Sequence, residues 1–190
     1  MAEKIEMLLA LQLSGIALLG IAPITFYGNT IHTILFSPEL PSMPWLFSFI
    51  ACCIALIIVG FISNKHIVIT SLYPISKNSV LAYYFVRAIF LFCYELFFRG
   101  FLLSDCMALW GNGPAIIFTT TLTVIIHAFA DKKEMIGCIP FGIVTAILCI
   151  TVHAVWPAIV LHIIISFTYE LPPIFRLFQD HKTTLIFKNN

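Results

Sequence analysis

The sequence has few charged residues and no excess of either sign. Its 190 residues include 10 basic and 9 acidic side chains, and 61% of the chain is hydrophobic. A soluble domain of this size could not bury so much apolar surface, so lipid must solvate part of the chain. The near balance of charge also excludes the basic surface that nucleic-acid binding requires. We therefore expect a membrane protein whose first partner is lipid, and no nucleic-acid partner.

The cysteines lack the spacing of a metal or disulfide framework. No CxxC pair occurs, and most of the six cysteines fall inside apolar runs. This placement is typical of small apolar residues within helices. The six positions are Cys52, Cys53, Cys93, Cys106, Cys138 and Cys149.

Apolar runs of about 20 residues, the length that crosses a bilayer as a helix, dominate the chain. The N-terminal run is too long for the apolar part of a signal peptide, so we expect a retained first span. Residues 67–73 are apolar but too few to cross, and could lie in the interface. The pattern predicts an all-α fold, one polytopic bundle (residues 1–190) with about six transmembrane helices. The expected spans are 5–27, 44–63, 79–106, 114–130, 136–154 and 156–175.

Basic residues outside the spans predict the orientation of this bundle. The connections 28–43, 107–113 and 155–156 contain no Lys or Arg, whereas the alternate connections and both ends do. Positive charge marks the cytoplasmic side, so both termini should be cytoplasmic. We expect a multi-pass protein of the plasma (inner) membrane. The basic positions are Lys4, Lys65, Lys77, Lys132, Lys133, Arg176, Lys182 and Lys188.

A few ionisable side chains remain inside the expected spans. Each costs about 2.5–3.5 kcal/mol at membrane depth on insertion scales, so these groups should face the bundle interior. Glu95 and Arg99 share a helix face at i, i+4 spacing and can pair, either as a purely structural ion pair or as part of a site. Arg87 can extend to the headgroups and is interpreted as structural. Glu170 lies near a helix end.

Two histidines complete this set of intramembrane polar groups. His127 follows the hydroxyl-rich run 119–123, and His162 shares a helix face with Ser166. A single histidine in a membrane helix is often only an interhelical contact. Two histidines and Glu95 could instead activate a water molecule, or bind a divalent metal such as zinc. His32 and His153 lie near the span edges and receive no role.

These residues resemble the motifs of the CPBP intramembrane proteases, the family of CAAX prenyl endopeptidases and of bacteriocin-processing and abortive-infection proteins. Glu95–x–x–x–Arg99–Gly resembles the first motif, Glu-Glu-x-x-x-Arg, and His127 resembles the second. Trp156-Pro-Ala, leading to His162, resembles the third, His-x-x-x-Asn. The resemblance covers about residues 79–170, the expected protease core.

The resemblance implies roles for these side chains. In the family, the first Glu and the second-motif His are thought to activate water, and the third motif forms the oxyanion site. Here Tyr94 replaces the first Glu, Thr123 replaces an aromatic residue and Ser166 replaces the Asn. Tyrosine is a poor base at neutral pH because its reference pKa is about 10. Glu95 could serve instead if the helix were turned by about 100°, one residue of an α-helix.

The resulting hypothesis is an endopeptidase that cuts a membrane-associated peptide or protein. Glu95, or a water bound to it, would be the base, assisted by His127, while His162 and Ser166 stabilise the oxyanion and Arg99 orients Glu95. His162 would lie about 9 Å from the non-cytoplasmic edge at 1.5 Å per residue, which predicts a cavity that opens away from the cytoplasm.

Two alternatives remain. One is a catalytically inactive family member that acts as a scaffold, chaperone or immunity factor. The other, a transporter or proton relay, is disfavoured because the sequence shows no internal repeat.

Overall fold

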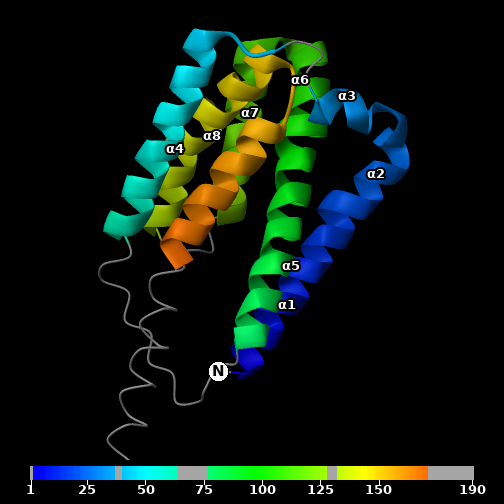
Figure 1. Cartoon of the computed structure of the whole chain (residues 1–190). Helices are drawn as coiled ribbons and strands as arrows, with labels where there is room; N and C mark the ends of the chain where they lie inside the picture. The colour runs from blue at the N-terminus through cyan, green and yellow to red at the C-terminus, as the bar shows by residue number, and fades with distance from the viewer. Residues whose placement is uncertain (1, 37–39, 64–76, 128–131, 171–190) are drawn as a thin grey trace, which may run out of the picture.

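The computed structural model describes residues 2–36, 40–63, 77–127 and 132–170. These residues are almost entirely helical and contain no strand, which confirms the all-α fold (Figure 1). Residues 67–73, the positions 128–130 and 171–175 at the ends of two expected spans, and Lys65, Arg176, Lys182 and Lys188 lie outside the described part.

The N-terminal part is one interrupted helix that extends from residue 2 to residue 35. Pro23 stands in the first turn of its second α-helical piece, directly after a π-helical turn. Proline has no amide hydrogen to donate, so it interrupts the helical hydrogen-bond ladder at this point. The pieces are α1 (Ala2–Ile16), η1 (Ala17–Ile21), α2 (Ala22–Tyr27), η2 (Gly28–Thr30) and α3 (Ile31–Leu35).

The remaining helices form the rest of the bundle. Gly111 joins two of them with φ of 79°, a backbone conformation that favours glycine. The helices are α4 (Met43–Ser63), α5 (Lys77–Glu95), η4 (Leu96–Leu102), α6 (Leu103–Trp110), α7 (Asn112–Ile126), α8 (Lys132–Val152) and the unlabelled orange helix Trp156–Glu170.

Four of the described helical segments are long and apolar enough to cross a membrane, namely Leu9–Leu35, Met43–Ser63, Leu81–Trp110 and Lys132–Val152. Two further apolar helices, Asn112–Ile126 and Trp156–Glu170, have 10–17 residues and so are shorter than a full span. The chain is therefore an integral membrane protein. Six crossings and cytoplasmic termini stay predictions.

The continuous helix α5–η4–α6 is the centre of the structure. It runs the length of the molecule, with α1 packed on one side and α7 on the other (Figure 1). Leu91, Leu96 and Phe101 on this helix are almost fully buried. By contrast, α4 exposes large apolar side chains such as Phe47 and Phe61. In a bilayer these exposed side chains contact lipid, whereas Arg87, Glu95 and Arg99 sit on the central helix.

Candidate active site

Glu95 and His162 contact each other directly across two helices. Glu95 ends α5, and its Oε1 lies 2.5 Å from Nδ1 of His162 on the helix Trp156–Glu170. Glu95 is 1% exposed. An ionised carboxylate only accepts hydrogen bonds, so Nδ1 of His162 must carry the hydrogen. The other ring nitrogen, Nε2, is then the one that carries a lone pair in the neutral imidazole.

Arg99 lies one turn beyond Glu95 and is held by hydroxyl groups of α7. Its Nε is 3.8 Å from Oε2 of Glu95, too long for a hydrogen bond, while Nη1 donates to Thr119 Oγ1 at 3.0 Å and Nη2 to Thr123 Oγ1 at 3.4 Å. Both threonine hydroxyls donate their own hydrogens to α7 carbonyls. Their oxygens are therefore available as acceptors, which explains why a hydroxyl-rich run faces the arginine.

The backbone around Arg99 is specialised in two ways. Arg99 lies in the π-helical turn η4, which directly follows Glu95; single π-helical turns are common at functional sites. On α8, Gly142 lies against the guanidinium, and a Cβ at this position would be 2.9 Å from Arg99 Nη2 and from Thr120 Cγ2. The close approach of α8 to Arg99 therefore requires glycine, a residue without a side chain, at position 142.

His127 directly follows the helix α7, and its ring, like that of His162, contacts Tyr94. Its Nδ1 is 2.8 Å from the carbonyl oxygen of Thr123. Because a carbonyl only accepts, Nδ1 donates and Nε2 carries the lone pair, as in His162. Tyr94 contacts both histidines edge-to-face, with ring centroids 6.3 Å from His127 and 5.5 Å from His162. The structure therefore groups Tyr94, Glu95, Arg99, His127 and His162.

Three polar atoms of this group have no hydrogen-bond partner among the described residues. They are the Tyr94 hydroxyl, Glu95 Oε2 and Arg99 Nε. A buried unsatisfied polar atom costs about 1–3 kcal/mol, and native proteins keep few of them. Three within six consecutive residues indicate a place where a water molecule or a substrate group completes the network.

Ser166 belongs to a different polar cluster, together with Arg87, Glu170 and Tyr83. Its hydroxyl accepts from Arg87 Nε at 3.2 Å and donates to Glu170 Oε1 at 3.3 Å. Arg87 also pairs with Glu170 at 3.3 Å, and the Tyr83 hydroxyl donates to the other carboxylate oxygen. Arg87 is thus paired inside the bundle. The sequence singles out Arg87, Ser166 and Glu170 separately. The i, i+4 spacing of Ser166 and Glu170 signals their contact, whereas no spacing signals the Arg87–Glu170 pair.

A metal site is not formed by the suggested ligands. Within the described ranges, no three His, Cys, Asp or Glu side chains lie in an arrangement that could bind a metal ion. Glu95, His127 and His162 are all described, and they do not form such a group. Oε1 of Glu95 instead accepts the hydrogen of an imidazole.

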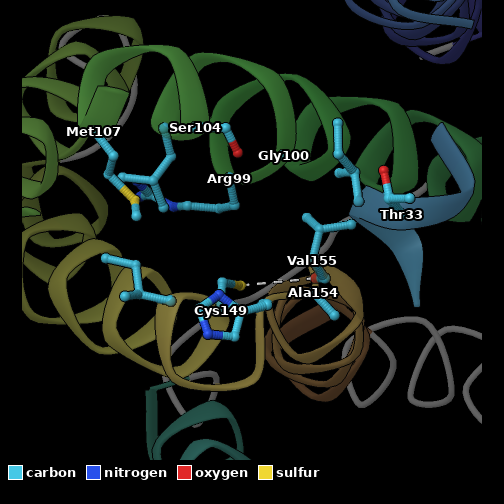
Figure 2. Close-up of a pocket in the computed structure, with 12 residues that line it drawn as sticks. Thr33, Arg99, Gly100, Ser104, Met107, Cys149, Ala154 and Val155 are labelled. Carbon is cyan, nitrogen blue, oxygen red and sulfur yellow. Dashed lines mark hydrogen bonds between the residues drawn. The ribbon is translucent and has the colours of Figure 1, made fainter. Parts of the chain in front are cut away.

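A cavity of about 140 Å³ lies beside Arg99, between η4–α6, the end of α8, residues 153–155 and α3 (Figure 2). Figure 2 shows the Arg99 side chain extending along it below the η4–α6 ribbon, toward Met107. His153, one of its lining residues, has φ of 51° and directly follows α8. Lining residues Thr33, Met107 and Val155 belong to or adjoin the connections expected on the non-cytoplasmic side. Sequence reasoning gave His153 no place in this cavity.

One family model matches the part of the chain that carries these residues. Residues 76–168 match the family model described as type II CAAX prenyl endopeptidase Rce1-like. These residues form an Rce1-like domain. The domain spans about half of the chain and contains Tyr94, Glu95, Arg99, His127 and His162. No curated protein and no solved structure matches the chain. The match supports a relationship between residues 76–168 and the CAAX and CPBP-type intramembrane proteases.

Proposed function

We propose that the Rce1-like domain is an active endopeptidase that cuts a membrane-associated peptide or protein with a water molecule activated by His162. The contact between Glu95 Oε1 and His162 Nδ1 carries the proposal. It fixes the imidazole with Nε2 as its acceptor, and a nearby carboxylate stabilises the imidazolium that forms when Nε2 takes a proton. Removing a proton from the attacking water is the role of a general base.

Glu95 acts through His162 in this proposal. In this proposal its Oε1 accepts from the imidazole and its Oε2 faces the charge of Arg99, and the water proton passes to His162 and not to the carboxylate. Arg99 stays fully charged and compensates the carboxylate in a low-dielectric interior. Glu95 and Arg99 are positioning residues in this proposal, which differs from the sequence-based hypothesis that Glu95, or a water bound to it, is the base.

His127 supplies a second imidazole with an acceptor nitrogen, and its ring contacts the same tyrosine, Tyr94, as that of His162. Its orientation is fixed by Thr123, whose hydroxyl also accepts from Arg99, so one threonine links the histidine to the ion pair. We expect His127 to hold the water molecule beside His162. Two fixed acceptors would orient the water for attack before the substrate arrives.

The proposal is tested by cleavage of co-expressed membrane proteins, with new termini identified by mass spectrometry. The wild-type protein should produce new termini, and His162→Gln and His127→Gln should abolish them while the protein remains folded in the membrane. His32→Gln is the matched control, because His32 is exposed and contacts only the ring of Phe36 among the described aromatic pairs.

Two outcomes would contradict the proposal. Cleavage at the wild-type rate by both His162→Gln and His127→Gln would remove the catalytic assignment. A wild-type protein that cuts nothing, but whose His162→Gln variant still restores a deletion phenotype, would identify a scaffold or immunity factor instead.

A further inference from the structure

Tyr94 occupies the centre of the site but has no function in the chemistry described so far. Its side chain is 3% exposed, and its ring lies edge-to-face against both His127 and His162. Its hydroxyl finds no hydrogen-bond partner in the described part of the chain. A buried tyrosine hydroxyl usually does find one, so this donor is left unpaired on a ring that contacts both histidines.

Among the described residues, the unpaired donors of the site are the Tyr94 hydroxyl and Arg99 Nε, and Nε faces Oε2 of Glu95 at 3.8 Å. The Nδ1 hydrogens of His127 and His162 are used by Thr123 and Glu95, which leaves only lone pairs at Nε2. Two of the Arg99 amino groups donate to threonines. Attack on a peptide carbonyl needs at least one hydrogen-bond donor at the oxygen on which negative charge develops.

Ser166, the residue that the family motif suggests for this purpose, is already engaged. Its hydroxyl hydrogen goes to Glu170, and its oxygen accepts from Arg87. The Tyr94 hydroxyl, by contrast, is a donor without an acceptor among the described residues, and its ring contacts the imidazole that would activate water. A phenol is also well suited to this task, since it stays neutral and protonated at physiological pH.

We propose that the Tyr94 hydroxyl is the oxyanion donor of the site, so that tyrosine in place of the family's first glutamate contributes a proton-bearing group and not a base. This inference rests on the proposed function. The water oxygen bonds to the carbonyl carbon while one water proton moves to Nε2 of His162. Tyr94 keeps its own proton and donates a hydrogen bond to the carbonyl oxygen throughout. When the C–N bond breaks, the departing amine takes the proton from the imidazole, leaving a carboxylic acid and an amine.

The decisive variant is Tyr94→Phe, which removes only the hydroxyl. Loss of one oxyanion donor lowers kcat by about 10²–10³-fold, and we expect this loss with KM nearly unchanged. The matched control is Tyr84→Phe. Tyr84 lies on the same helix α5, is 9% exposed and also has an unpaired hydroxyl among the described residues, but it contacts Tyr83 and Phe167 and not the histidines. Cleavage by Tyr84→Phe should stay within a few-fold of wild type.

A second measurement separates donation from packing. Fluorinated tyrosines incorporated at position 94 make the phenol more acidic with little change of shape, so kcat should vary with the acidity of the phenol. The same residues at position 84 should leave kcat constant.

The results that would overturn the inference differ from those that overturn the proposed function. If wild-type protein cleaves its substrate but Tyr94→Phe cleaves equally well, Tyr94 is not the donor and the His162 mechanism stands. If Tyr94→Glu is more active than wild type, the position requires a carboxylate and the inference is wrong. If wild-type protein cleaves nothing, both fail together.

Discussion

Two arginine–glutamate pairs lie inside this bundle, and they are built differently. In the Glu95–Arg99 pair the side chains are 2% and 1% exposed, with one oxygen of Glu95 and Nε of Arg99 left unpaired among the described residues. In the Arg87–Glu170 pair the side chains are 26% and 22% exposed, and both carboxylate oxygens have partners, from Arg87, Ser166 and Tyr83. The Arg87–Glu170 pair, in which both carboxylate oxygens are bonded, holds α5 against the helix Trp156–Glu170. A buried pair with unused hydrogen-bonding atoms is what a site needs if it is to bind a water molecule or a substrate group.

The largest difference between the pairs should be in stability when the arginine is removed. Arg99→Ala leaves Glu95 uncompensated at full burial, which costs about 3–5 kcal/mol, so we expect little folded, extractable protein. Arg87→Ala breaks a partly exposed pair and should cost about 1 kcal/mol. Thermal unfolding of the detergent-purified variants measures both losses. Equal stability of Arg99→Ala and wild type would contradict the burial of the first pair.

An intermediate effect should come from the glycine that faces Arg99. Gly142→Ala places a methyl group 2.9 Å from the guanidinium, and overpacking of this kind costs about 1–3 kcal/mol. Gly137→Ala on the same helix is the control, because a Cβ there meets nothing within 4 Å. In a helix that change should be neutral or stabilising by up to about 1 kcal/mol. If the two variants unfold at the same temperature, α8 does not approach Arg99 as described.

The smallest effect should follow removal of the Ser166 hydroxyl. Ser166→Ala deletes an acceptor for Arg87 and a donor to Glu170, and should lower stability by about 1 kcal/mol. Cleavage should change by less than tenfold, since Ser166 is bonded to the Arg87–Glu170 pair. A loss of about 10²–10³-fold, the range for an oxyanion donor, would return Ser166 to the active site and argue against the separation of the two clusters.

The sequence predicts the helices better than it predicts the contacts between them. The apolar run 44–63 predicts the start of α4 to within one residue. Glu95, Arg99, His127 and His162 are grouped by a different signal, because ionisable side chains inside apolar runs avoid lipid. The i, i+4 rule foresees the Glu95–Arg99 pair. The Arg87–Glu170 pair joins residues 83 positions apart, so only the packed fold brings it together.

The finer geometry of the site depends on features without a reliable sequence signal. The π-helical turn η4 changes the rotation of the residues around Arg99, and an ideal α-helix would not reproduce their directions. The sequence identifies Tyr94 as a departure from the family motif. It does not reveal that the ring lies against two imidazoles with an unpaired hydroxyl, because that depends on three helices at once.

The account is tested most directly by the cleavage rates of Glu95→Gln and Glu170→Gln, measured side by side on one identified substrate. Both changes are isosteric and remove one charge from an intramembrane pair. Glu95→Gln should lower the rate by about 10²–10⁴-fold, because an amide no longer supports the imidazolium of His162. Glu170→Gln should stay within tenfold of wild type. Equal rates for the two variants, or wild-type cleavage by Glu95→Gln, would contradict the proposal that the buried Glu95–Arg99 pair, and not the Arg87–Glu170 pair, positions the catalytic histidine.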